Sequence, residues 1–154
     1  MLTGDWDKLI RQLGQAGERL KAEAQKATNE NGRLLEETMV GHFEAQDLGW
    51  VPLKPDYLAW KLREGLSEET LFATTTLLQN IRYHERSWHE GFVGVLRGAT
   101  YQKSGESVVN IAAVHEYGTK DGRVPARPFV APTLAECEPQ ISQNYQEAVV
   151  RAFK

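Results

Sequence analysis

The pair His115-Glu116 combines two side-chain types that often supply acid–base chemistry or a zinc ligand. A zinc site on a helix would need a second ligand four residues after His115, and that position is Thr119. A hydrolase would need a nucleophile next to the pair, and none stands at a recognisable spacing. We therefore predict neither a metal site nor a catalytic site, while a small hydrolase that uses His115 and Glu116 remains an alternative.

The glycines and the cysteine form no cofactor or redox motif. The sequence has no Gly-x-Ser-x-Gly elbow, no phosphate-binding loop and no Gly-x-Gly-x-x-Gly fingerprint. Gly91, Gly94 and Gly98 have the wrong spacing for a dinucleotide loop, so we interpret them as turn and strand-packing residues. Cys137 is the single cysteine, which excludes an internal disulfide and predicts an unreactive residue on a helix. No cofactor is expected.

The charge of the chain argues against general binding to nucleic acid. The net charge is -3, since residues 1–50 carry nine acidic and six basic side chains and residues 51–154 carry twelve of each. A duplex-binding domain usually has a basic excess on one face, and the sequence shows no such excess. General nucleic-acid binding is therefore disfavoured, and a nucleic-acid-associated module is kept only as an alternative. The sequence shows no secretory signal and no apolar run near the roughly 20 residues of a membrane span. The expected location is the cytosol.

Apolar residues at helical spacing predict a long helix over residues 1–46. A continuous helix of this length would span roughly 60 Å at about 1.5 Å per residue, so part of it would project from a small domain. The alternative is two helices that fold back at Gly32, because residues 28–32 are a plausible break. The narrow apolar stripe fits either an oligomer seam or packing on the chain's own sheet.

The rest of the chain predicts a compact core of mixed helices and strands. The expected order is a helix at 57–64 capped by Asp56, a helix from Ser67 to about Gln79, strands at 81–84, 92–96 and 108–111, a helical turn at 112–117, an extended stretch at 124–127 and a helix at 129–153. The predicted fold is α+β, with a long N-terminal helix, an antiparallel sheet of about four strands and a C-terminal helix packed on the sheet. Residues 1–154 form one domain, with a helical arm at 1–46 and an α+β core at 50–154.

Two segments near the C-terminus resemble a known family. His-Glu-Tyr-Gly-Thr at 115–119, followed by Val-Pro-Ala-Arg-Pro-Phe-Val at 124–130, is similar to the C-terminal hallmark of phage tail-completion and virion-morphogenesis proteins. Trp-Val-Pro-Leu at 50–53 with Lys61, and the segment 71–81, are also similar to this family. The chain departs from the family pattern at Thr75, where glycine is usual, and at Asn80, where serine is usual.

The resemblance implies a structural role and no catalysis. Proteins of this family sit at the neck between head and tail or cap the tail tube, commonly as a six-fold ring. The implied partners are further copies of the chain and other neck, head-completion or tail-tube proteins, without membrane or sequence-specific nucleic acid. The implied location is the host bacterial cytoplasm during assembly and then the virion. A ring needs two complementary surfaces on each subunit.

Polar residues on loops 100–106 and 118–124, together with the first helix, are the candidates for those contact surfaces. The interaction residues we predict are Arg127, Lys120, Asp121, Lys103 and Glu106. Two readings are open for Arg127. Prolines on both sides stiffen the chain, so Arg127 either contacts a partner or serves only to build the junction that Phe129 anchors in the core.

Overall fold

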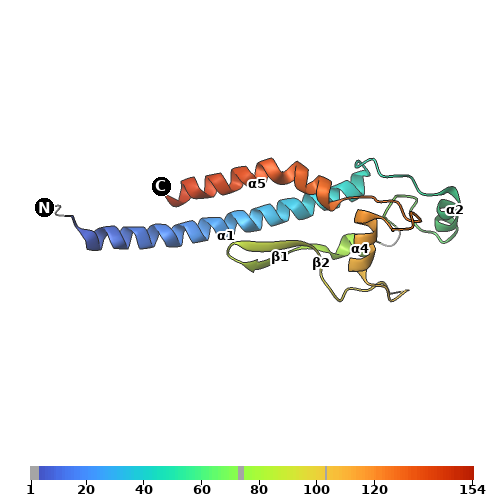
Figure 1. Cartoon of the computed structure of the whole chain (residues 1–154), viewed down its shortest axis with the longest axis horizontal. Coiled ribbons are helices and arrows are strands. Elements are labelled where there is room, and N and C mark those ends of the chain that lie inside the picture. Colours follow the sequence, from blue (N-terminus) through green and yellow to red (C-terminus); the bar gives the residue numbers. More distant parts are fainter. Residues whose placement is uncertain (1–3, 73–74, 103) are drawn as a thin grey trace.

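The computed structural model describes residues 4–72, 75–102 and 104–154, and Figure 1 shows their arrangement. The elements in order are α1 (Trp6–Ala45), α2 (Pro55–Arg63), α3 (Thr76–Asn80), β1 (Ile81–Ser87), β2 (Glu90–Val95), α4 (Val108–Tyr117) and α5 (Val130–Ala152). The α+β class, the long N-terminal helix and the C-terminal helix are confirmed. None of the described helices is long and apolar enough to cross a membrane.

Helix α1 is one unbroken helix of 40 residues. Asp5 caps its start by accepting a hydrogen bond from the backbone of Lys8 at 2.9 Å. Gln46 ends it in the left-handed conformation, with φ of 54°. The alternative of two helices that fold back at Gly32 is therefore wrong.

Gly32 lies in the middle of α1 because the ring of Tyr83 passes directly over it. A Cβ atom on Gly32 would overlap ring atoms of Tyr83, and one on Gly91 of β2 would overlap the same ring. The Tyr83 hydroxyl also donates to Asn29 Oδ1 at 2.6 Å. Glycine at position 32 thus permits close packing of the hairpin on α1 and does not end the helix.

We expect Gly32→Ala to lower the free energy of unfolding by about 2 kcal/mol, because the added methyl group overlaps the Tyr83 ring. Gly41→Ala is the matched control, since a Cβ at that position of α1 meets nothing within 4 Å. Alanine there should raise the free energy of unfolding by up to about 1 kcal/mol through helix propensity. Urea unfolding of both variants checks this, and stabilisation by both substitutions would contradict the packing role of Gly32.

The sheet is a two-stranded hairpin and not the predicted sheet of about four strands. Strands β1 and β2 pair antiparallel, with Ile81 opposite Val95 and Tyr83 opposite Val93. Outside this hairpin, the described residues contain one isolated bridge, between Thr100 and Ser107. The predictions of strands near 81–84 and 92–96 are confirmed, and the prediction of four strands is wrong.

The predicted third strand, at residues 108–111, is the first turn of α4. A run of four residues that includes three apolar ones fits a strand and a helix equally well, and only its continuation to Tyr117 separates the two. Val108 is fully buried, and its amide donates to Ala99 O at 2.9 Å. The predicted helix end is confirmed, because Gly118 has a φ of 73° and its amide donates to Val114 O.

Two predicted helix starts in the middle of the chain are wrong. Helix α2 has Lys54 and not Asp56 at its N-cap, because Pro55 takes the first helical position. Ser67 does not begin a helix, since its hydroxyl accepts from the Glu69 amide in a tight turn. Within the described part of segment 67–80, the helix that forms is the short α3. Residues 73 and 74 of the predicted helix lie outside the described residues.

Thr75 precedes α3 in the left-handed conformation, with φ of 56° and ψ of -6°. A β-branched residue is strained there, whereas glycine, the residue usual in the resembling family, is not. We expect Thr75→Gly to raise the free energy of unfolding by up to about 1 kcal/mol, since the strain relieved exceeds the extra entropy of the unfolded chain. Urea unfolding measures this, and destabilisation would contradict it.

Helix α5 runs antiparallel along α1 and continues through Pro139. Three polar contacts align the two helices: Arg151 Nε to Glu23 Oε2 at 2.6 Å, Tyr145 OH to Thr28 Oγ1 at 3.0 Å, and Asn144 Nδ2 to Asn31 Oδ1 at 2.6 Å. Figure 1 shows α1 between α5 and the hairpin. Cys137 is buried on α5, as expected for an unreactive residue.

The core lies where the second half of α1 meets the ends of the other elements. Its buried residues are Met39, Phe43, Leu77, Ile81, Val108 and Phe129. The first half of α1 takes no part in this core and extends beyond α5 (Figure 1). The chain thus has a packed body at one end and a helical arm at the other.

Candidate functional site

The carboxylate of Glu116 caps the start of α5. Oε2 accepts from the amides of Phe129 at 2.8 Å and Val130 at 2.9 Å, and Oε1 accepts from the amide of Ala131 at 3.1 Å. The N-cap residue Phe129 has no side-chain oxygen to do this. A negative charge at this position also interacts favourably with the helix dipole. Both carboxylate oxygens of Glu116 are therefore used in fixing α5 to α4.

Arg127 is buried, with 6% of its surface exposed, and holds the chain that precedes α2. Its Nε donates to Val51 O at 2.9 Å and its Nη2 donates to Pro52 O at 3.3 Å. Its amide donates to His115 O at 2.6 Å. The planar guanidinium thus joins residues 51–52 to the segment between α4 and α5.

Aromatic residues complete this junction. Trp50 donates from Nε1 to Pro128 O at 2.8 Å, and its ring lies 5.4 Å from that of Phe43. The ring of Phe129 lies 5.1 Å from Phe43 on another side. The segments that resemble one family in the sequence therefore contact one another. We call this contact the junction, and its residues are 50–52, 115–116 and 127–129.

A cavity of about 510 Å³ lies next to the junction. Four cationic side chains line it, namely Lys54, Lys61, Arg123 and Arg127, and its described lining includes no aspartate or glutamate. Lys61 is 1% exposed, and burial lowers the pKa of its amine. Its Nζ donates to Glu69 O at 2.7 Å, so this lysine too holds a backbone segment in place.

His115 lines the same cavity in its neutral form. Burial, and secondly the charge of Arg127, lower the pKa of His115 from 6.5 to about 4. Its Nδ1 atom is buried without a hydrogen-bond partner among the described residues. A histidine of this kind is not poised to exchange protons near neutral pH.

We expect this histidine to make the fold sensitive to acid. The folded pKa lies below the unfolded value, so the stability that neutral His115 contributes is present above pH 6.5 and is lost as the pH falls towards about 4. The loss should be about 2 kcal/mol after allowance for partial exposure. Urea unfolding across this pH range should show a smaller loss for His115→Leu. Equal losses in both proteins would contradict the assignment.

Three of the other predicted interaction residues, Lys120, Asp121 and Glu106, lie on exposed loops. Asp121 accepts from the Arg123 amide at 3.1 Å, and hydrogen bonds from the Thr119 side chain and the Arg123 backbone lower the pKa of its carboxyl group. Lys120 and Glu106 are exposed, on the loops after α4 and before α4. Lys103 lies outside the described residues. Unlike Lys120, Asp121 and Glu106, Arg127 is buried within its own chain.

Sequence reasoning left open whether the stripe of α1 is a seam or internal packing, and the structure divides it. Ala27, Met39 and Phe43 are buried within the chain. Trp6, Ile10 and Leu13, near the start, are 61%, 65% and 62% exposed. Large apolar residues on and just after α5 are also exposed, namely Leu134, Val149, Val150 and Phe153. The apolar pattern of α1 alone did not indicate at which residue packing against the rest of the chain would end.

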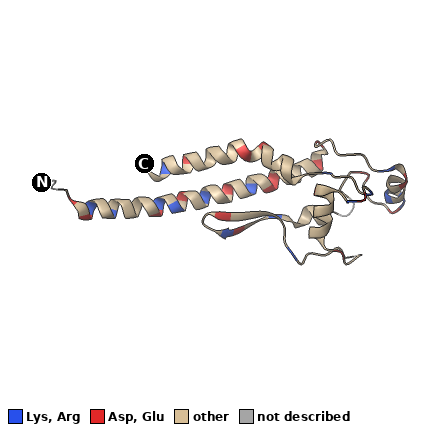
Figure 2. Cartoon of the chain, in the orientation of Figure 1, with Lys and Arg blue, Asp and Glu red and all other residues tan. Residues whose placement is uncertain are grey.

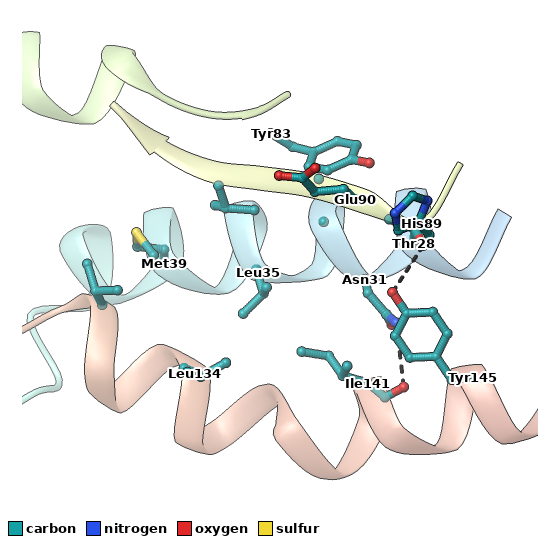
Figure 3. Close-up of a pocket in the computed structure, with 14 residues that line it drawn as sticks. Thr28, Asn31, Leu35, Met39, Tyr83, His89, Glu90, Leu134, Ile141 and Tyr145 are labelled. Atoms are coloured by element: carbon teal, nitrogen blue, oxygen red, sulfur yellow. Dashed lines mark hydrogen bonds between the residues drawn. The ribbon is translucent and has the colours of Figure 1, made fainter. Parts of the chain in front are cut away.

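A groove of about 350 Å³ runs over α1 between β2 and α5 (Figure 3). Leu35 and Met39 form its floor, and Leu134 and Ile141 of α5 line one side. Hydrogen bonds from Asn31 to Ile141 O and between Thr28 and Tyr145 close one end. Apolar side chains of α1 and α5 therefore make up much of the lining of this groove.

Charges of both signs are mixed along α1 (Figure 2). Among the residues that the structure describes, no group of three His, Cys, Asp or Glu side chains is placed to hold a metal ion.

Comparison with known proteins finds a similar archaeal sequence. The chain is 28% identical over 110 residues to an uncharacterized protein of Methanocaldococcus jannaschii, a match that covers 71% of this chain and 74% of that protein. No family model matches the chain. No solved structure matches it.

Proposed function

We propose that this chain is a structural subunit of a phage tail or neck, a tail-completion or head–tail joining protein that assembles as a ring and catalyses no reaction. The observation that carries the proposal is the junction of residues 50–52, 115–116 and 127–129. These segments resemble phage tail-completion proteins one by one, and they contact one another in the folded chain.

The polar groups of the junction support a structural role. Glu116 has both oxygens occupied by the first amides of α5, and Arg127 is bonded to Val51 O and Pro52 O. His115 is partly buried, and desolvation lowers its pKa to about 4. The hydrolase that would use His115 and Glu116 would have to break the α5 cap to free its carboxylate, so the geometry favours the structural proposal.

The exposed apolar surfaces support assembly. The groove between β2 and α5 and the exposed residues Val149, Val150 and Phe153 leave apolar surface uncovered. A ring closes through two different surfaces on each subunit, and we assign this role to these apolar surfaces together with the polar residues Glu106, Lys120 and Asp121. Head, neck and tail-tube proteins are the proposed further partners, in the host cytoplasm during assembly and then in the virion.

Deletion of the gene in an inducible phage or prophage tests the proposal, with the lysate viewed by negative-stain electron microscopy. We expect separate full heads and tails, or tails of abnormal length or stability, and the kind of defect would identify joining or completion. Supplying the intact gene from a plasmid should restore normal particles. Normal infectious particles in the deletion strain would contradict the proposal.

A further inference from the structure

The first part of α1 is an arm without a covering helix. Helix α5 ends at Ala152, and its Arg151 pairs with Glu23, so α5 does not reach the residues before about position 22 (Figure 1). The apolar stripe nevertheless continues into this arm at helical spacing. Its members there are Trp6, Leu9, Ile10, Leu13, Ala16, Gly17 and Leu20.

We propose that the arm, residues 5–21, pairs antiparallel with the same arm of a second copy of the chain. Along the rest of α1 the same face is covered by α5, which also runs antiparallel to α1. The second arm would continue that cover from the point where α5 ends. The part of α1 that α5 leaves uncovered, residues 5–21, has the same length in both copies, so the two arms can cover each other along their whole length.

The charges beside the stripe are arranged for this orientation. One edge of the apolar stripe carries, at seven-residue spacing, Asp5, Gln12 and Arg19. The other edge carries, at the same spacing, Asp7, Gly14 and Lys21. An antiparallel pair related by a twofold axis near Leu13 places each edge against its own reversed copy. Asp5 then faces Arg19 of the second copy, and Asp7 faces Lys21 of the second copy.

A parallel pair would lack this match. It would place Asp5 and Asp7 of both copies at one end, and Arg19 and Lys21 of both copies at the other. Like charges so arranged repel. The sign of the charges along the arm therefore selects the antiparallel orientation.

In the antiparallel pair, large side chains of one arm also face small side chains of the other. Leu13 lies at the twofold axis, and the large Leu9 and Ile10 face Gly17 and Ala16 of the second copy. A Cβ at Gly14 or Gly17 would meet nothing within 4 Å in the single chain, so space for a close approach exists there. Trp6 comes to lie near Leu20 and the exposed Phe153 of the second copy. Both large aromatic side chains would thus be covered.

This contact is separate from the ring of the proposed function. It joins identical surfaces about a twofold axis, whereas a ring closes through two different surfaces. It can therefore be correct or wrong whatever the role of the protein in a virion.

Analytical ultracentrifugation of the full chain over a range of concentrations tests the proposal. We expect a dimer that Leu13→Glu weakens at least about a hundredfold, because the substitution places two like charges at the axis. Arg11→Glu, on the opposite face of the arm, should leave the dimer unchanged. Circular dichroism of the variants checks that α1 still folds. A monomer at all concentrations, or a dimer or larger assembly unaffected by Leu13→Glu, would overturn the proposal.

A charge exchange tests the orientation. Asp7→Lys and Lys21→Glu should each weaken self-association about tenfold, because each creates two repulsive pairs in the dimer. Mixed in equal amounts, the two variants should associate as tightly as the unchanged protein. In the mixed dimer the lysine introduced at position 7 faces the glutamate introduced at position 21, and the remaining Asp7 faces the remaining Lys21. Failure of the mixture to regain the affinity would overturn the antiparallel arrangement.

Discussion

Replacing Arg127 by alanine is expected to lower the free energy of unfolding by about 3 kcal/mol. The side chain is buried and donates to Val51 O and Pro52 O, so its loss leaves both carbonyl groups without these donors and a gap in the junction. Arg127→Lys should have a smaller effect, because it keeps the charge but cannot reproduce the planar pair of donors. Urea unfolding at neutral pH measures both losses.

The same variant separates the two readings of Arg127. A fall in stability together with a matching fall in assembly supports the architectural role, whereas loss of assembly with an unchanged melting temperature would support contact with a partner. Arg97→Ala is the matched control, because Arg97 is exposed and its removal should change stability by less than about 0.5 kcal/mol. An Arg127→Ala protein as stable as this control would contradict the architectural role of Arg127.

Replacing Glu116 by alanine is expected to lower the free energy of unfolding by about 2–3 kcal/mol. The substitution removes one carboxylate that accepts three backbone amides at the start of α5, and with it a favourable charge at the helix N-terminus. Glu116→Gln should be intermediate, since the amide oxygen accepts hydrogen bonds without the negative charge. Thermal and urea unfolding report the loss.

Glu138→Ala is the control for this prediction, because Glu138 lies exposed on the same helix. It should change stability by less than about 0.5 kcal/mol. Hydrogen exchange adds a local measurement: in Glu116→Ala the amides of Val130 and Ala131 should exchange faster than in the unchanged protein. Unchanged exchange at these amides would contradict the capping role, whatever the overall stability.

The elements predicted best from the sequence were those with long periodic patterns. Helices α1 and α5 follow the 3.6-residue spacing over many turns, and the hairpin follows a short alternation with a turn between its strands. Helix α4 was divided wrongly into a strand and a turn because its first four residues, three of them apolar, are too few to show a period. Local pattern fails where the run is shorter than about two helical turns.

The contacts that fix the junction depend on residues far apart in the chain, so no local pattern indicates them. Glu116 caps a helix that begins 14 residues later, and Tyr83 requires glycine at position 32. The sequence did indicate that prolines would stiffen the segment around Arg127 and that Phe129 would enter the core, and Phe129 is buried. It could not indicate that the Arg127 side chain turns inward to Val51 and Pro52.

The proposed role in a phage particle is tested most directly by immunogold labelling of particles purified from a strain that carries the gene. An antibody against the chain, or against a tag at its C-terminus, should mark one position on each particle, either at the neck or at the end of the tail. The label should be absent from particles made without the gene. Intact particles that carry no label and contain no copy of the chain by mass spectrometry would contradict a structural role in the virion.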